Sequence, residues 1–146
     1  MTWDEKYTDK RILTLHPEIR ERVELFINTV HSELGIKIRV TQANRSIPYQ
    51  NELYAKGRTT PGRIITKVKG GYSYHNYGLA FDICIIKDGK ADFKITQEIA
   101  DLAIKMGFEW GGSWKNFKDK PHFQMTYGYT CSQLMNLKQT GKYKNL

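Results

Sequence analysis

Apolar residues recur at helical spacing in two stretches of the chain. The first begins at Pro17, a residue type favoured in a first helical turn, and stops at Gly35. The second begins after Thr96, a good helix cap, and stops at Gly107. The apolar positions are Ile19, Val23, Phe26, Val30 and Leu34 in the first stretch, and Ile99, Leu102, Ala103 and Met106 in the second. Each stretch is expected to form an amphipathic helix.

Strands are predicted where apolar and polar residues alternate. In "IKIRVTQ", residues 36–42, the isoleucines and valine fall on one face and Lys, Arg and Thr on the other. Residues 79–86 also indicate a strand, and the following "KDGK" predicts a hairpin because Asp-Gly suits tight primed turns. The segments "GFEWGGSW" and "PHFQMTY" are the last strand candidates. With a short helix from Ser46 to Gly57 and a helical turn near "SQLMNL", the pattern predicts an α+β fold with a central, mainly antiparallel sheet flanked by helices.

The segment between Arg58 and Gly71 is rich in Thr, Pro, Gly and Lys and is expected to be a long loop, although "RIIT" within it could form a short strand. Loops of this length in a compact domain are usually functional. No repeat or linker divides the 146 residues, so the expectation is a single domain spanning residues 1–146.

The chain is basic, with a net charge of +8, and residues 34–74 hold eight basic residues against one acidic residue, Glu52. This charge favours an anionic partner: nucleic acid, a lipid surface or an acidic polymer of a cell envelope. No nucleic acid is expected, because no zinc-finger spacing, RNP-type strand or basic zipper occurs. No transmembrane segment and no secretory signal are expected, so synthesis in the cytoplasm without a signal peptide is predicted. Cys84 and Cys131 are expected to be free thiols.

Two histidines and two aspartates form the candidate chemical site. On a strand over residues 79–86, Asp82 shares a face with the small residue Ala80, and His75 could reach that face from the preceding turn. His122 lies in the "PHFQMTY" strand, with Asp119 just upstream. His75, Asp82 and His122 make a ligand set suited to zinc with a fourth position for water, and Asp119 could accept the proton of that water.

The alternative is that each of these residues is an ordinary hydrogen-bonded polar side chain with a structural role. For any one residue alone that interpretation is preferred, but the set of four together favours a metal centre. His16 and His31 have no carboxylate partner that suggests chemistry and are interpreted as structural.

Several segments together resemble one known family. "LYAKGRTTPGRIITKVKGGYSYHNYGLAFDICI" and "GFEWGGSWKNFKDKPHFQM" resemble the paired signatures of zinc-dependent cell-wall peptidases, a family that includes D,D-peptidases of vancomycin resistance and the L-alanyl-D-glutamate endopeptidases of bacteria and phages. "ANRSIPYQNELY" and "LHPEIRERVELFI" resemble further segments of the endopeptidase branch, so the resemblance covers about residues 11–126. It implies the small α+β fold shared with the zinc-binding signalling domain of hedgehog proteins.

Carried onto matching positions, the resemblance implies zinc as cofactor, held by His75, Asp82 and His122, with Asp119 as the catalytic carboxylate. It further implies that Arg45 stabilises the developing oxyanion or holds a substrate carboxylate, and that Gln50 and Ser73 support the substrate side of the site. One departure is that Gln42 and Ala43 stand where the family leads into the arginine with a Ser-Gly-Tyr-like sequence.

The function that this resemblance implies is peptidoglycan hydrolysis. A zinc endopeptidase is expected to cut the L-Ala-D-Glu bond of the stem peptide, as a phage or prophage endolysin that reaches the wall after release or export. The basic surface would attract it to the anionic wall without a separate wall-binding domain, and a monomer is expected. The alternatives are a D,D-carboxypeptidase or dipeptidase on the same zinc site, and a zinc-stabilised binding domain without catalysis.

Overall fold

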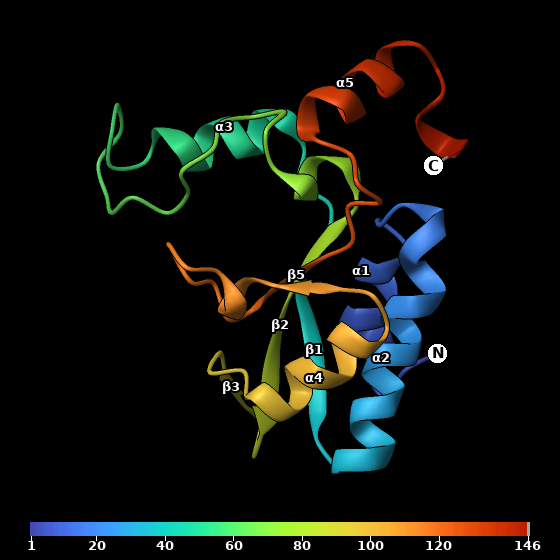
Figure 1. Cartoon of the computed structure of the whole chain (residues 1–146). Coiled ribbons are helices and arrows are strands. Elements are labelled where there is room, and N and C mark those ends of the chain that lie inside the picture. The colour runs from blue at the N-terminus through green and yellow to red at the C-terminus, as the bar shows by residue number, and fades with distance from the viewer. Residues whose placement is uncertain (146) are drawn as a thin grey trace.

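A five-stranded antiparallel sheet forms the centre of the computed structural model, which describes residues 1–145 (Figure 1). The strands are β1 (Lys37–Gln42), β2 (Ala80–Lys87), β3 (Lys90–Asp92), β4 (Glu109–Trp110) and β5 (His122–Gln124). They lie in the order β1, β2, β5, β4, and β3 pairs with the far end of β2. The predicted α+β fold with a mainly antiparallel sheet is confirmed.

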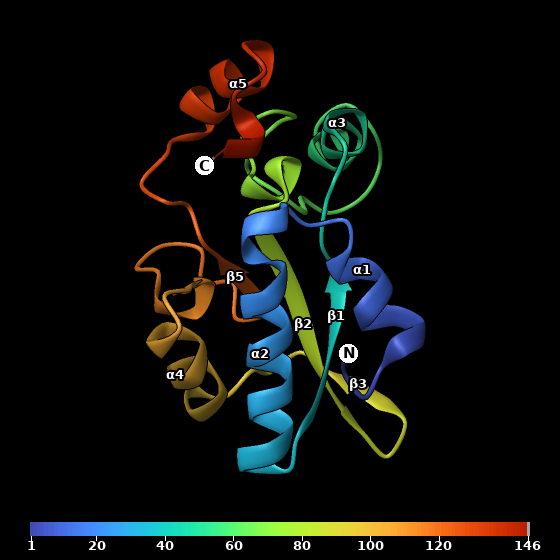
Figure 2. The ribbon, with the colours of Figure 1, turned by 90° about the vertical axis from the view of Figure 1, so that its right-hand side faces the viewer.

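Helices pack beside this sheet and beyond one of its ends. They are α1 (Lys10–Ile12), α2 (Pro17–Leu34), α3 (Ile47–Ala55), α4 (Gln97–Lys105) and α5 (Cys131–Gln139), a π-helical turn at Glu5–Asp9, and 3-10 helices at Tyr74–Tyr77, Gly111–Ser113 and Tyr143–Asn145. α2 and α4 pack against each other beside the sheet, and α3 and α5 lie beyond its end (Figures 1 and 2). Within residues 1–145, no helix has the length and apolar character needed to cross a membrane.

The core forms between α2 and the sheet because the two patterns of apolar residues face each other. Phe81 on β2 and Phe123 on β5 are fully buried and stack with ring centroids 5.8 Å apart. Phe26 from α2 packs on both rings, 6.3 Å from Phe81 and 5.5 Å from Phe123. Because strand side chains alternate, burial of Phe81 turns its neighbour Asp82 to the opposite face, away from this core.

The N-terminal segment covers the edge of β1 with side-chain hydrogen bonds. Trp3 Nε1 donates to the carbonyl of Ile38, and the backbone N–H of Val40 donates to the hydroxyl of Thr8. Asp4 accepts from Thr8 and forms an ion pair with Arg39 at 2.8 Å. These contacts occupy strand-edge groups that would otherwise pair with another chain. The sequence patterns did not predict the π-helical turn at Glu5–Asp9 or the side-chain contacts of this segment with β1.

Most predicted elements are confirmed with small shifts of their ends. The first helix ends where Gly35 adopts a left-handed conformation, and Ser46 and Thr96 cap α3 and α4 through their hydroxyls. The hairpin turn is also present, with positive φ at Asp88 and Gly89. The suggested short strand at "RIIT" is not observed, and this stretch remains an exposed part of the loop. The C-terminal helical turn extends into the nine-residue helix α5.

Both cysteines are free thiols; Cys84 is buried, as expected, whereas Cys131 is only half-buried rather than buried. Burial raises the pKa of the Cys131 thiol to about 11, which disfavours the reactive thiolate at neutral pH.

Candidate metal centre

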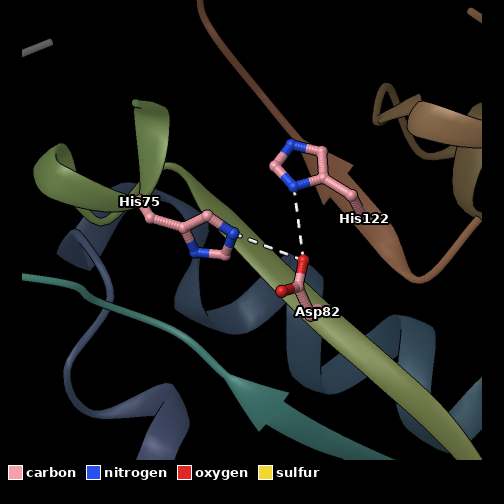
Figure 3. A group of neighbouring side chains, drawn as sticks. All are labelled: His75, Asp82 and His122. Carbon is pink, nitrogen blue, oxygen red and sulfur yellow. Dashed lines mark ion pairs between the residues drawn. The ribbon is translucent and has the colours of Figure 1, made fainter. Parts of the chain in front are cut away.

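Three side chains from separate segments meet at one end of the sheet. His75, Asp82 and His122 place one potential ligand atom each within 4.8 Å of one another. Asp82 and His122 face each other across the β2–β5 pair, where they are direct partners in the antiparallel register. His75 reaches the same point from the helical turn that precedes β2 (Figure 3). The convergence predicted from the sequence is therefore present in the structure.

The position of His75 depends on a tightly capped 3-10 helix. Ser73 accepts a hydrogen bond from the backbone N–H of His75, and Asn76 completes a capping box with Ser73. Gly78 ends the turn with φ 68°, and an added Cβ would collide with the backbone of His16 at 2.5 Å. A glycine is thus needed where the chain turns from His75 into β2.

The ring orientation of His75 leaves one nitrogen directed at Asp82. Its Nδ1 lies 2.8 Å from the carbonyl of Ala43, and a carbonyl can only accept, so Nδ1 carries the proton. The unprotonated Nε2 then points at Asp82 Oδ1, 3.3 Å away. Nδ1 of His122 lies at the same distance of 3.3 Å from the same carboxylate oxygen (Figure 3).

These separations fit a divalent metal ion better than they fit hydrogen bonds. Nε2 of His75 and Oδ1 of Asp82 are buried and have no hydrogen-bond partner in the described residues. Such orphaned polar atoms are rare because each costs free energy when it is removed from water. Ligand atoms about 2.0–2.1 Å from a tetrahedral zinc ion would be roughly 3.3–3.4 Å apart, which matches both observed distances. The donor set of two imidazoles and one carboxylate suits zinc.

The charges of the three side chains are strongly coupled. Burial opposes ionisation of Asp82, but the two histidines outweigh burial and lower the pKa of this carboxyl far below its usual range. Burial lowers the pKa of His75. Burial has the same tendency at His122, but the contacts with Asp82 and Gln124 raise the pKa of His122 overall. Asp82 therefore presents a permanent negative charge to any cation bound here.

Arg45 lies against the second oxygen of the Asp82 carboxylate. Its Nη2 donates to Asp82 Oδ2 at 3.3 Å and to Gln42 Oε1 at 2.7 Å, and its Nη1 donates to Gln50 Oε1 at 3.4 Å. Its Nε has no partner in the described part of the chain. The guanidinium is thus held at the edge of the site with capacity for a further acceptor.

The residues predicted to support the substrate side lie behind the site. Gln50 is fully buried and links Arg45 to the loop through the carbonyl of Val68 at 2.9 Å. Ser73 is also buried and caps the turn that carries His75. Direct contact of these two side chains with a substrate stays a prediction. Gln42, noted in the sequence only as a departure from the family pattern, is a hydrogen-bond partner of Arg45.

Asp119 is brought beside the centre by a tight turn before β5. Its carbonyl accepts from the N–H of His122 at 3.1 Å, and its N–H donates to the carbonyl of Gly111 at 3.0 Å. A Cβ at Gly111 would overlap the backbone of Asp119, so glycine permits this approach. Trp110 Nε1 also holds this turn, because it donates to the carbonyl of Lys120 at 2.7 Å.

The carboxyl of Asp119 is not one of the three grouped ligands, but it lies close enough for their charges to affect its pKa. Partial burial of the group and the negative charge of Asp82 raise the pKa of Asp119. The residue is exposed to solvent, so water limits the size of this shift. A carboxylate with these properties can exchange protons near the metal position.

Two exposed segments with basic side chains flank the centre. The loop between α3 and Tyr74–Tyr77 exposes Arg58, Arg63, Lys67 and Lys69, and the segment before β5 exposes Lys115, Lys118 and Lys120. The ammonium of Lys67 lies over the ring of Phe117 and so connects the two segments. The surface around the site is therefore suited to an anionic molecule.

Comparison with known proteins gives a consistent result. Residues 66–125 match a family profile described as D-alanyl-D-alanine carboxypeptidase. The peptidoglycan L-alanyl-D-glutamate endopeptidase CwlK of Bacillus subtilis is 39% identical over 126 residues, which cover 76% of this chain and 73% of CwlK. The L-alanyl-D-glutamate peptidase of Listeria phage A118 is 38% identical over 63 residues, 39% of this chain and 22% of the phage protein.

A solved structure supports the fold. The L-Ala D-Glu endopeptidase ChiX of Serratia marcescens superposes with a TM-score of 0.62 at 24% sequence identity, covering 84% of this chain and 88% of ChiX. His75, Asp82 and His122 lie within the segment that matches the family profile. The chain belongs to the family of cell-wall peptidases that includes the L-alanyl-D-glutamate endopeptidase CwlK.

Proposed function

We propose that this peptidase cleaves the L-alanyl-D-glutamate bond of the peptidoglycan stem and that it uses zinc held by His75, Asp82 and His122. The observation that carries the proposal is the set of three converging ligand atoms, two of them buried without a hydrogen-bond partner in the described residues, with both nitrogens 3.3 Å from Asp82 Oδ1, a separation typical of a tetrahedral zinc site. Zinc, when bound, would polarise the scissile carbonyl and lower the pKa of an attacking water. The names of the relatives support this bond as the substrate.

In this proposal Asp119 is the general base and then the general acid. Its carboxylate takes the proton of the attacking water and later gives that proton to the leaving amine of D-glutamate. Its exposed position and its turn beside His122 favour this role over direct ligation. Without a bound metal ion, partial burial and the charge of Asp82 raise the pKa of Asp119, and a zinc ion would oppose this shift and keep the carboxylate ionised to accept the proton.

Arg45 is proposed to stabilise negative charge on the carbonyl oxygen as the tetrahedral intermediate forms. Gln42 and Gln50 hold the guanidinium in place before substrate binds, so little reorganisation is needed during reaction. The basic segments around the centre would attract the carboxylates of the stem peptide and the anionic wall surface. Action on the wall then requires release or export of the enzyme, and we expect it to act as a monomer.

The second candidate function is a D,D-carboxypeptidase or dipeptidase activity at the same centre, which the description of the matching family profile favours. A binding domain without catalysis is disfavoured, because a purely structural zinc site has no use for a carboxylate such as Asp119 beside it. The two enzymatic candidates differ in the bond that is broken.

Purified sacculi provide the deciding experiment. The protein is incubated with sacculi with and without a chelator, and the new termini are labelled and identified by mass spectrometry. New N-terminal D-glutamate that disappears with chelator and returns with zinc supports the proposal. Release of D-alanine instead would assign carboxypeptidase activity, and no new terminus of either kind would refute hydrolysis of the stem.

A further inference from the structure

We infer that Gln124 and Glu109 are positioning residues that present His122 as an Nδ1 ligand. This inference rests on the proposed zinc centre. His75 and Asp82 are held by the Ala43 carbonyl and by Arg45, whereas His122 depends on a side-chain relay of its own. The relay runs from His122 to Gln124 on β5 and from Gln124 to Glu109 on β4.

The register of the sheet aligns this relay. Asp82 on β2 faces His122 on β5, and two residues further along β5 Gln124 faces Glu109 on β4. Residues two positions apart share a face of a strand, so Gln124 stands beside His122 on the side of the metal centre. On its other side Gln124 faces Ala80, whose small side chain leaves room for the amide.

The direction of each hydrogen bond follows from Glu109. A carboxylate only accepts, so the amide nitrogen of Gln124 must donate to Glu109 Oε2, at 2.8 Å. This contact turns the amide oxygen of Gln124 toward His122, where it lies 2.8 Å from Nε2. Nε2 must then carry a proton, which leaves the lone pair of Nδ1 directed at the metal position.

Because Gln124 and His122 are buried, loss of a hydrogen bond in the relay costs free energy. Gln124 and His122 are 8% and 7% exposed, so neither can replace a lost partner freely with water. The ring of Trp114 lies beside His122 with centroids 5.2 Å apart and restricts the imidazole from one side. Glu109 is exposed, so the relay ends in solvent rather than in a second buried charge.

The test measures zinc affinity by competition with a chromophoric chelator, which does not depend on activity. Gln124→Leu, of similar volume, should weaken zinc binding by about 10–100-fold, the usual effect of losing such a partner of a ligand histidine. Glu109→Leu should weaken zinc binding less than Gln124→Leu does. Glu109→Gln keeps an acceptor for the Gln124 amide and should weaken zinc binding less than Glu109→Leu. Glu33→Leu, at an exposed position on α2, controls for loss of a surface charge and should bind zinc like the parent.

A double variant that exchanges the two side chains, called the swapped pair, controls for misfolding. Gln124→Glu combined with Glu109→Gln preserves the net charge. The amide at position 109 can then donate to the carboxylate at position 124, and that carboxylate can still accept from His122 Nε2. Zinc affinity should return well above that of Gln124→Leu. In NMR spectra of the zinc-loaded parent and swapped protein, the Nε2 proton of His122 should be protected from exchange, and Gln124→Leu should lose that signal.

Parental zinc affinity in Gln124→Leu, or a swapped pair that binds as weakly as Gln124→Leu, would overturn the relay. A Glu109→Leu variant that binds zinc like Glu33→Leu would remove Glu109 from it. These results are separable from failure of the proposed function, because a parent that binds zinc and leaves sacculi intact would refute peptidoglycan hydrolysis while leaving the relay standing.

Discussion

Replacement of Asp119 by asparagine isolates proton transfer from metal binding. The change keeps the size of the side chain and the two backbone hydrogen bonds that hold the turn, at 3.0 and 3.1 Å. The three ligand atoms of His75, Asp82 and His122 are untouched. Zinc content should therefore stay near one ion per chain, while the group that accepts the proton of the attacking water is lost.

The expected loss is large because a positioned general base contributes about 10²–10⁴-fold to the rate. At about 1.4 kcal/mol for each factor of ten, this corresponds to about 3–5 kcal/mol of transition-state stabilisation. The effect should appear in kcat more than in KM, because Asp119 acts on the reacting water and not on the bound stem.

The pH profile gives a second reading of the same substitution. Asp119 must be ionised to accept a proton, and partial burial together with the charge of Asp82 raises its pKa. A bound zinc ion opposes this shift because its positive charge favours the ionised carboxylate, so the expected result is an acidic limb of kcat through which the rate falls as pH drops. Asp119→Asn should remove that limb from the residual activity.

The assay follows release of soluble stem fragments from sacculi, with zinc measured in the same samples by elemental analysis. Asp88→Asn is the matched control, because it makes the same chemical change in an exposed hairpin turn whose positive φ suits asparagine. Parental hydrolysis by Asp119→Asn would refute the assignment of the base, and loss of zinc from this variant would make Asp119 a ligand.

Three further substitutions test other parts of the structure. His122→Ala should lose both zinc and turnover, and stoichiometric zinc in that variant would refute the ligand set. Arg45→Ala should lower kcat by roughly 10²–10³-fold with zinc retained, and unchanged kinetics would exclude it from oxyanion stabilisation. Asp4→Ala removes the ion pair with the partly exposed Arg39 and the hydrogen bonds from Thr8, and should cost about 1–3 kcal/mol of unfolding free energy in chemical denaturation. Burial opposes ionisation of Asp4, but Arg39 and Thr8 lower its pKa, so its stabilisation is present at neutral pH and fades as pH falls below about 4. Equal acid sensitivity in parent and variant would contradict this.

The local elements were predictable because their signals are contained in short stretches of sequence. The helix from Pro17 follows from apolar residues at helical spacing and a terminal glycine, and the hairpin follows from Asp88 and Gly89. The alternation around Asp82 correctly placed its carboxylate on the face away from the core. The π-helical turn at Glu5–Asp9 escaped prediction because its partners lie on β1, more than 30 residues away.

The candidate site was predictable only as a set of residue types and a family resemblance. His75, Asp82, Asp119 and His122 could be named from their motifs, but their separations depend on the pairing of β2 with β5. The contact of Arg45 with Gln42, the last residue of β1, also depends on the conformation of the chain as it leaves the strand. Glu109 carried no signal at all, because an exposed glutamate is an ordinary surface residue.

The sequence by itself determined α2, α3 and α4, the hairpin, the basic charge and the identity of the residues able to bind a metal. These properties depend on local backbone preference, on the spacing of apolar side chains and on composition. The tertiary structure alone decided that His75 Nε2, Asp82 Oδ1 and His122 Nδ1 converge and that Nε2 of His122 meets the amide oxygen of Gln124. The physical reason is that strand register and buried hydrogen bonds fix side-chain directions, and both arise only when distant segments pack together.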